Sequence, residues 1–403
     1  MSGALDGVRV LDLTSVLMGP FATQLLGDMG AEVIKVEPPT GDTTRGLEPA
    51  RHAGMGAAFL HVNRNKRSIV LDLKQPTGHA ALLRLVKLSD VLVYNVRPLA
   101  MARLDLAWPR LSAVNPRLIY AGVFGYGQDG PYAAKPAYDD LIQGAIGLPS
   151  LVARVGDGTP RYVPIALVDR TVGMSAAMAV SAALYRREKS GVGQAIDIPM
   201  FETMVPFMLA EHLAGQTFEP PMGAAGYARL LARERTPFVT QDGYVCALIY
   251  SDGQWRSFFK MLGQPERCAS DPRLATLASR THHIEALYSM VAEILLTRTT
   301  SEWLTLFETA DIPASPLHTL DSLPTDPHLA AVNYFQTTLH PSEGAIREMR
   351  PASRWSESPA AIRRPAPRLG EHSAEILAEA GYTADEIADM VARRVTTVPP
   401  ISP

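Results

Sequence analysis

An alternation of short apolar runs with helix-like segments in the first half of the chain constrains the fold more than any other feature. Residues 8–13 form an apolar run, residues 21–29 have the character of a helix closed by Gly30, and residues 31–36 form a second apolar run. Strand, helix and strand in close succession make a βαβ unit, whose two strands pair in parallel through a right-handed crossover. The N-terminal segment therefore predicts a parallel sheet.

The same alternation continues along the chain. We expect further strands at residues 68–73, 91–94, 118–123 and 194–198, and helices at residues 78–87, 170–187 and 373–380. Strands joined in this way need helices on both faces of the sheet. The prediction is an α/β fold with an open, mostly parallel, doubly wound sheet.

The length of 403 residues exceeds what one hydrophobic core usually organises, so we expect two domains. The alternation is lost near residues 215–221, and a mixture of a strand and helices follows. These elements are expected at residues 243–249, 254–262, 283–296 and 301–310. We predict a large α/β domain of residues 1–215 plus 328–403, and a smaller α+β domain of residues 216–327.

The composition argues against several classes of protein. A hydrophobic content of 47% and a net charge of −3 are typical of a globular protein with neither nucleic acid nor membrane as partner. Two cysteines without a C-x-x-C motif and ten histidines without an H-x-x-x-H motif predict no metal site. Neither a signal-peptide pattern nor an apolar run of about 20 residues is present, so we expect a cytoplasmic protein.

Asp169 follows the apolar run 164–168 and precedes the predicted helix 170–187. At a strand-to-helix corner, the free N–H groups and the positive end of the helix dipole keep a carboxylate ionised. An ionised carboxylate in that place can attack an activated carbonyl and carry an acyl group. An ordinary helix N-cap has the same local sequence, so both interpretations stay open at this point.

Basic and amide residues follow several of the predicted strands. Loops after parallel strands meet at the carboxyl edge of the sheet, where doubly wound folds bind their ligands. Cations gathered there would hold a phosphorylated cofactor, arginine in bidentate fashion, whereas each alone resembles a solvated surface charge. The residues that follow strands are Lys74, Asn95, Arg97, Arg103 and Lys135, whereas Lys66 and Arg67 precede the predicted strand of residues 68–73.

Residues 125–130 match the G-x-G-x-x-G fingerprint of dinucleotide-binding proteins and follow a predicted strand. The fingerprint requires a helix directly after the glycines, and residues 131–136 begin and end with proline, which disfavours that helix. We interpret the motif as a glycine-rich turn that permits close backbone approach to a ligand or another chain.

The ordered combination of segments resembles the class III CoA-transferase family, which includes formyl-CoA transferase and carnitine CoA-transferase. The segments that carry the resemblance are residues 5–13, 30–37, 65–68, 71–74, 120–128, 167–169 and 367–372. Asp169 falls where that family places its nucleophile. The resemblance implies acyl-aspartyl anhydride and aspartyl-CoA thioester intermediates on Asp169, with no metal, no permanently bound cofactor and coenzyme A as a substrate.

The resemblance also assigns contacts and an assembly. Backbone N–H groups near Gly226 would stabilise the oxyanion, and two chains would interlock as a homodimer. The residues that fall on the family's CoA-contacting positions are Leu71, Lys74, Asn95, Arg97, Arg103 and Lys135.

The substrate is expected to be a dicarboxylic acid. Pro38 replaces an arginine that some members carry, and residues 15–17 lack the polar residues of formyl-CoA transferase, which disfavours formate and oxalate. The run 226–238 resembles the branch acting on dicarboxylates, with Gly226 and Tyr227 at the substrate and Arg229 binding its distal carboxylate. Succinyl-CoA or a similar thioester is the expected donor, although these arginines also have the character of surface charges.

Three other functions remain open from the sequence. An α-methylacyl-CoA racemase needs a pair of bases, and this chain has Tyr138 and Asp139 where such enzymes carry a His-Asp pair. A non-catalytic CoA-binding protein would not use Asp169. A nicotinamide-dependent oxidoreductase would need the helix that residues 131–136 disfavour.

Overall fold

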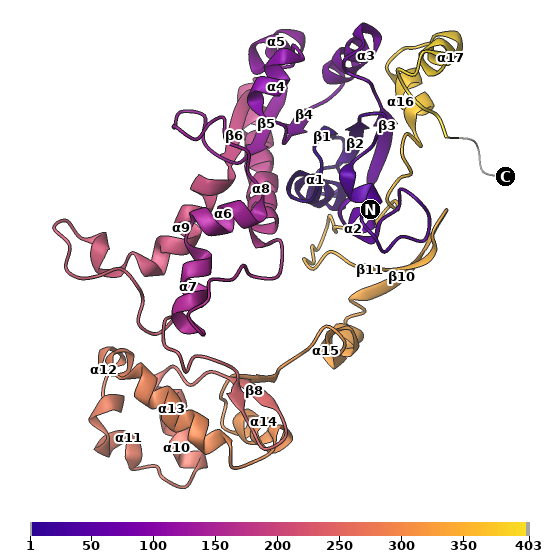
Figure 1. Cartoon of the computed structure of the whole chain (residues 1–403). Coiled ribbons are helices and arrows are strands. Elements are labelled where there is room, and N and C mark those ends of the chain that lie inside the picture. The colour runs from indigo at the N-terminus through magenta and orange to yellow at the C-terminus, as the bar shows by residue number, and fades with distance from the viewer. Residues whose placement is uncertain (1, 400–403) are drawn as a thin grey trace. The chain divides into compact units, whose positions relative to one another are not determined.

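The computed structural model describes residues 2–399 and divides into two compact units (Figure 1). The first unit contains Met1–Ile146, Val163–Phe207 and Ala331–Pro403, and the second contains Gly147–Tyr162 and Met208–Ala330. The predicted domain boundaries lie near the same places, but residues 147–162, which were expected in the large domain, cluster with the second unit.

The first unit is built on a six-stranded sheet with the strand order β3-β2-β1-β4-β5-β6, and every pairing in it is parallel. The strands are β1 (Arg9–Leu13), β2 (Glu32–Glu37), β3 (Lys66–Val70), β4 (Val91–Tyr94), β5 (Ile119–Phe124) and β6 (Gln194–Pro199). The predicted doubly wound sheet is therefore confirmed. The order reverses between β1 and β4, which creates a topological switch point at their carboxyl ends.

Alternate residues of the strands face two separate cores. Val10, Val91 and Val93 face one core, while Leu11 and Leu92 face the other. The first core is covered by α1 (Met18–Asp28) and α8 (Leu167–Ser190). The second is covered by α3 (Pro76–Lys87), α5 (Trp108–Val114), α16 (Ser373–Glu379) and α17 (Ala384–Ala392).

The helix α8 is apolar and long enough to cross a membrane by length and composition alone, and no other described helix is. It packs against α1, α6 (Asp139–Ala145), β5 and β6. Small side chains such as Gly173, Ala176 and Ala177 permit this close packing, since a Cβ at Gly173 would stand 2.8 Å from the Met18 carbonyl oxygen. One face of α8 lies in the first core, while the apolar side chains Met174, Met178 and Tyr185 of the same helix are exposed.

Lys66 and Arg67 instead belong to ion pairs, and the side chains of both cations are buried. Lys66 Nζ lies 2.9 Å from Asp12 Oδ2, and both side chains are fully buried. Beside them Lys35 Nζ lies 2.8 Å from Asp42 Oδ2. Arg67 pairs with acidic residues of β2 and α16. Lys66 and Arg67 therefore hold the sheet together, which corrects the expectation that they bind a ligand.

Several elements complete the first unit. The hairpin of β10 (Phe335–His340) and β11 (Gly344–Met349) was not predicted from the sequence. The remaining helical segments are η1 (Thr43–Gly46), α2 (Ala57–Val62), α4 (Pro98–Arg103) and the start of α9 (Met200–His212).

The second unit has its own core, in which Trp255, Phe258, Trp303 and Phe307 are almost completely buried. Its antiparallel sheet consists of β7 (Phe238–Val239), β8 (Tyr244–Ala247) and β9 (Ala314–Pro316). Its main helices are α7 (Leu148–Val155), α10 (Asp252–Met261), α13 (Ile284–Leu295) and α14 (Thr300–Thr309). Shorter helical segments are η2 (Ala214–Thr217), α11 (Arg267–Ser270), η3 (Pro272–Leu274), α12 (Leu277–His282), η4 (Leu323–Thr325) and α15 (Pro327–Ala331).

Candidate active site at the carboxyl edge of the sheet

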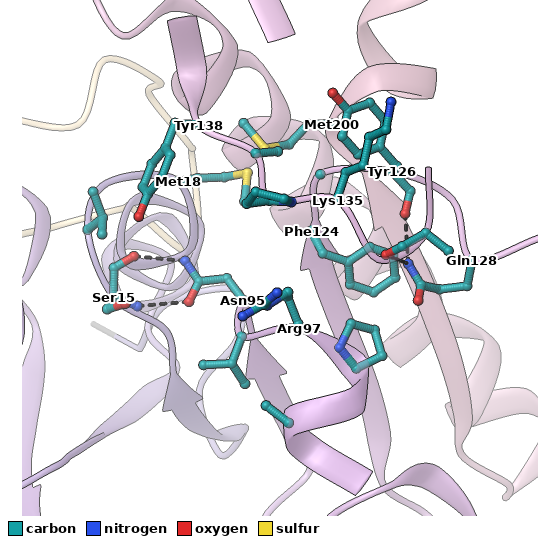
Figure 2. A pocket seen from close by; sticks show the side chains of 18 of the residues that line it. Ser15, Met18, Asn95, Arg97, Phe124, Tyr126, Gln128, Lys135, Tyr138 and Met200 are labelled. Atoms are coloured by element: carbon teal, nitrogen blue, oxygen red, sulfur yellow. Dashed lines mark hydrogen bonds between the residues drawn. The ribbon is translucent and has the colours of Figure 1, made fainter. Parts of the chain in front are cut away.

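A pocket of about 420 Å³ lies at the carboxyl ends of β1, β4 and β5, and we call it the switch-point pocket (Figure 2). It stands at the place where a doubly wound sheet most often binds its ligand. Side chains from five separate segments of the first unit line it. They include Ser15, Met18, Asn95, Arg97, Phe124, Tyr126, Gln128, Lys135, Tyr138, Asp169 and Met200.

Asp169 lines this pocket from the first turn of α8, with 9% of its surface exposed. The expected strand before it is wrong, because α8 already begins at Leu167 and Val168 is fully buried within its first turn. The N-cap residue is Ala166, whose side chain offers no acceptor. Instead, the Asp169 backbone N–H donates to Asp139 Oδ1 at 2.9 Å. The Asp169 carboxylate itself accepts no hydrogen bond from residues 2–399.

The surroundings of Asp169 disfavour its ionised form more than its position at a helix start predicts. Burial, followed by the negative charge of Asp139, raises the pKa of Asp169 to about 6, and the Arg170 guanidinium partly opposes this shift. The helix end therefore keeps the Asp169 carboxylate less fully ionised than predicted. A carboxyl of this pKa is still mainly ionised near pH 7, and it is a more basic nucleophile than an exposed aspartate.

The segments that follow β1 and β4 are joined across the switch point. The Ser15 N–H donates to Asn95 Oδ1 at 3.0 Å, and Asn95 Nδ2 donates to the Ser15 carbonyl at 2.8 Å (Figure 2). Val16 has a φ of 70°, which is unusual for a β-branched residue, and its N–H donates to Asp42. Asn95 thus fixes one wall of the pocket, and its side chain is already engaged within the protein.

Three predicted cations lie at or beside the pocket. Arg97 and Lys135 line it, from the segment after β4 and from the loop before α6 respectively (Figure 2). Arg97 also lines an adjoining pocket of about 120 Å³ together with Arg103, at the end of α4. None of the three has an ion-pair partner within residues 2–399, although Lys135 Nζ lies 3.6 Å from the centre of the Tyr132 ring. Their free charges leave them able to bind an anion.

Leu71 and Lys74 lie elsewhere. β3 stands at the edge of the sheet, two strands away from the β1 to β4 switch point. The Leu71 side chain is buried in the core that α16 covers, whereas the Lys74 side chain is exposed. Neither residue lines the switch-point pocket or the adjoining pocket.

The glycines of residues 125–130 form part of the pocket wall. A Cβ at Gly125 would stand 2.3 Å from the Ala137 Cβ, so only glycine fits there. The Gly127 N–H donates to Glu202 Oε1 at 2.8 Å. The close approach permitted by this turn is thus made to other segments of the same chain. Tyr138 lines the pocket as well, although from the sequence it was noted only for standing where racemases carry the histidine of their His-Asp pair.

The residues predicted to bind the substrate belong to the second unit. The Gly226 N–H donates to the His212 carbonyl at 2.7 Å, and the Tyr227 N–H donates to His212 Nδ1 at 3.3 Å. Both groups are engaged, which corrects the expectation that they are free to stabilise an oxyanion. The Arg229 guanidinium lies 5.2 Å from the centre of the Tyr250 ring.

No group of three or more His, Cys, Asp or Glu side chains among residues 2–399 is arranged to hold a metal ion. The chemistry that the pocket offers comes instead from one buried carboxylate with several cations near its rim.

Comparison with known proteins agrees with this arrangement. Residues 5–373 match the family described as CoA-transferase family III. A succinate–glutarate CoA-transferase of Agrobacterium fabrum is 35% identical over 334 residues, which cover 81% of this chain and 83% of that protein. A succinyl-CoA–D-citramalate CoA-transferase of Chloroflexus aurantiacus is 33% identical, over 97% of this chain and 98% of that protein.

A solved structure has the same fold. The crystal structure of a CAIB/BAIF family protein from Brucella suis superposes with a TM-score of 0.78 at 31% identity, covering 94% of this chain and all of that one. The sequence match and the structural match both extend over nearly the whole chain, and they confirm the resemblance found in the sequence. The chain belongs to CoA-transferase family III.

Proposed function

We propose that the protein moves CoA from an acyl-CoA donor to a carboxylic acid, with Asp169 as the covalent carrier. One observation carries this proposal. The Asp169 carboxylate is buried and lines a pocket at the switch point, and among residues 2–399 it receives no hydrogen bond. Cations that have no ion-pair partner in the same described range are available there for the CoA phosphates. This setting supports a role as nucleophile, because buried carboxylates with a structural role are as a rule hydrogen-bonded.

The reaction begins when an Asp169 carboxylate oxygen attacks the thioester carbonyl of the donor. The C–S bond breaks, giving a mixed anhydride and the CoA thiolate. The thiolate then attacks the Asp169 carbonyl carbon, which releases the donor acid and leaves an aspartyl-CoA thioester. An acceptor carboxylate runs the same steps in reverse. One thioester replaces another, so the exchange is nearly balanced in free energy and transfers no net proton.

The pocket residues bind and orient CoA in this proposal. Arg97, Arg103 and Lys135 neutralise phosphate charge, and the arginines are suited to bidentate contacts. Asn95 fixes the loop between them. Both covalent intermediates hydrolyse readily, so the apolar side chains Met18 and Met200 in the pocket wall favour transfer to an acid over transfer to water.

Racemase activity is the second candidate function for this fold. Its proton transfer needs two bases, and the second base would have to come from Tyr138 or Asp139. The Asp139 carboxylate is already occupied by the Asp169 N–H and by Gln143 Nε2 at 2.6 Å. Covalent transfer needs only the one carboxylate that this pocket holds free.

For the substrates we propose succinyl-CoA or a similar dicarboxyl-CoA as donor and a dicarboxylate or its sulfinate analogue as acceptor, with Arg229 binding the distal acid group. The names of the succinate–glutarate and succinyl-CoA–D-citramalate enzymes support this choice. A panel of acids assayed with succinyl-CoA tests it. A preference for monocarboxylates, or an unchanged acceptor KM in Arg229→Ala, would refute this assignment.

We also propose that the enzyme works as a homodimer in the cytoplasm. The exposed apolar side chains Met174, Met178 and Tyr185 along α8 support a partner surface. Light scattering at micromolar concentration should give twice the mass of the chain, and a monomer would contradict the proposal. The cytoplasmic location stays a prediction.

The decisive experiment for the function compares wild type with Asp169→Ala. Liquid chromatography and mass spectrometry follow CoA exchange between an acyl-CoA and a free acid. We expect exchange by the wild type and none by the variant, with circular dichroism showing both folded. Near wild-type exchange by the folded variant would refute the mechanism, and inversion without exchange would favour the racemase.

A further inference from the structure

The start of α8 is capped by another helix. The side chain of its N-cap residue, Ala166, accepts no hydrogen bond, so the free N–H groups of the first turn need an acceptor from elsewhere. Asp139, the first residue of α6, supplies it by accepting the Asp169 N–H at 2.9 Å. Asp139 is thirty positions away in the sequence and does not line the pocket.

Asp139 is itself held in place by a buried amide. Gln143, one turn further along α6 and fully buried, donates from Nε2 to Asp139 Oδ2 at 2.6 Å. Gln143 Oε1 accepts the Val163 N–H at 2.9 Å, and its Nε2 also approaches the Ile165 carbonyl at 3.5 Å. Asp139 and Gln143 thus tie α6 to the segment that leads into α8.

We propose that Asp139 is a positioning residue for the Asp169 nucleophile. It occupies the backbone N–H at the start of α8, so that the Asp169 carboxylate is not drawn onto its own helix end and remains directed into the switch-point pocket. Gln143 fixes the orientation of Asp139. The inference rests on the proposed function of Asp169 and adds the residues that prepare it.

The charge of Asp139 contributes a second effect. It is the largest charge contribution raising the pKa of Asp169, after burial. The other charged or titratable groups around Asp169 differ in sign. Arg170 is adjacent on α8, Asp140 follows Asp139 on α6, and Arg97, Lys135 and Tyr138 line the same pocket. The first turn of α1 carries no acidic residue. Removing the charge of Asp139 should therefore lower the pKa of Asp169 and weaken it as a base.

Two variants and one control separate position from charge. Asp139→Ala removes both the acceptor and the charge, while Asp139→Asn keeps an oxygen for the Asp169 N–H and removes the charge. Asp140→Ala is the matched control, because Asp140 is an exposed acid on the same helical turn with no hydrogen-bonded side chain within residues 2–399. CoA exchange is measured as kcat and KM from pH 4.5 to pH 9, a range of about two units on either side of neutrality.

We expect Asp139→Ala to lower kcat by about 100-fold, the scale on which misplacing a reacting group acts, with little change in the affinity for free CoA. Asp139→Asn should recover much of kcat. In both variants the acid limb of the kcat/KM profile, which is the pH range where kcat/KM rises, should move to lower pH. Asp140→Ala should match wild type in kcat and in the position of this acid limb.

Two results would overturn the inference: wild-type kcat in Asp139→Ala, or an acid limb that stays in place in Asp139→Asn. The second result decides the matter even if the alanine variant does not fold. Failure of the proposed function is distinguishable from failure of this inference. If the proposed function were wrong, wild type itself would show no CoA exchange that depends on Asp169.

Discussion

Replacing Arg97 or Arg103 by alanine should weaken the binding of CoA without unfolding the protein. Both side chains are exposed and line the pocket that adjoins the switch-point pocket. Neither guanidinium has an ion-pair partner within residues 2–399, so its removal leaves no carboxylate unpaired. The lost binding free energy should therefore come from the missing contact with phosphate and from little else.

The magnitude follows from the exposure of these groups. A hydrogen bond to a charged group contributes about 1.5–3 kcal/mol, and solvent screening at an exposed site lowers this value. We expect about 1–2 kcal/mol for each arginine, which raises the Kd for CoA by about 5–30-fold. The loss should shrink as salt is added, because both the phosphate and the guanidinium are then screened.

Calorimetric titration with free CoA at two ionic strengths measures these changes. Arg110→Ala is the control, since Arg110 is exposed to 48%, pairs with Asp105 and lines neither pocket. Titration with CoA lacking its ribose phosphate shows which arginine contacts that phosphate, because the corresponding variant no longer distinguishes the two ligands. Unchanged affinity in both Arg97→Ala and Arg103→Ala would refute the assignment of this rim to CoA.

Two further outcomes follow from the buried charges. The ionised form of Asp169 is the active one, and the pKa of this carboxyl is raised to about 6. We therefore expect kcat/KM to rise with pH through 6 and to lie about tenfold below its plateau at pH 5. A rise of kcat/KM centred near pH 4 would contradict the buried setting of Asp169. Lys66→Met removes the partner of fully buried Asp12 and should cost about 3 kcal/mol in the free energy of unfolding, measured in denaturant. A loss below about 1 kcal/mol would show that Lys35 and the hydroxyl donors compensate.

Much of the first unit could be predicted because its strands are short, apolar and regularly spaced. β4 and β6 begin where the sequence places them, and Asp169 lies at the start of the long helix. The start of that helix was misjudged because Leu167 and Val168 are apolar, as strand residues would be. Val168 is apolar because it packs into the core from the first turn of α8, and Leu167 beside it is partly buried.

Other features depend on contacts that a linear pattern does not contain. The strand order places Leu71 and Lys74 two strands from the switch point. Lys66 was predicted at a ligand because nothing nearby in the sequence identifies Asp12 as its buried partner. The bond from the Asp169 N–H to Asp139 likewise joins α8 to α6, and the whole of α7 lies between these two helices in the sequence. Charged residues whose partners are distant in sequence account for most of the differences.

The fate of one oxygen atom tests the covalent role of Asp169 most directly. In the proposed mechanism the acceptor acid attacks the aspartyl-CoA thioester, and one of its carboxylate oxygens stays on Asp169 when CoA leaves with the acceptor acyl group. The enzyme is incubated with succinyl-CoA and an acceptor labelled with oxygen-18 in its carboxylates, digested, and analysed by peptide mass spectrometry. Label is expected in the side chain of Asp169 and in no other carboxylate of the peptides covering the site. Complete turnover of the donor with Asp169 free of label would contradict it.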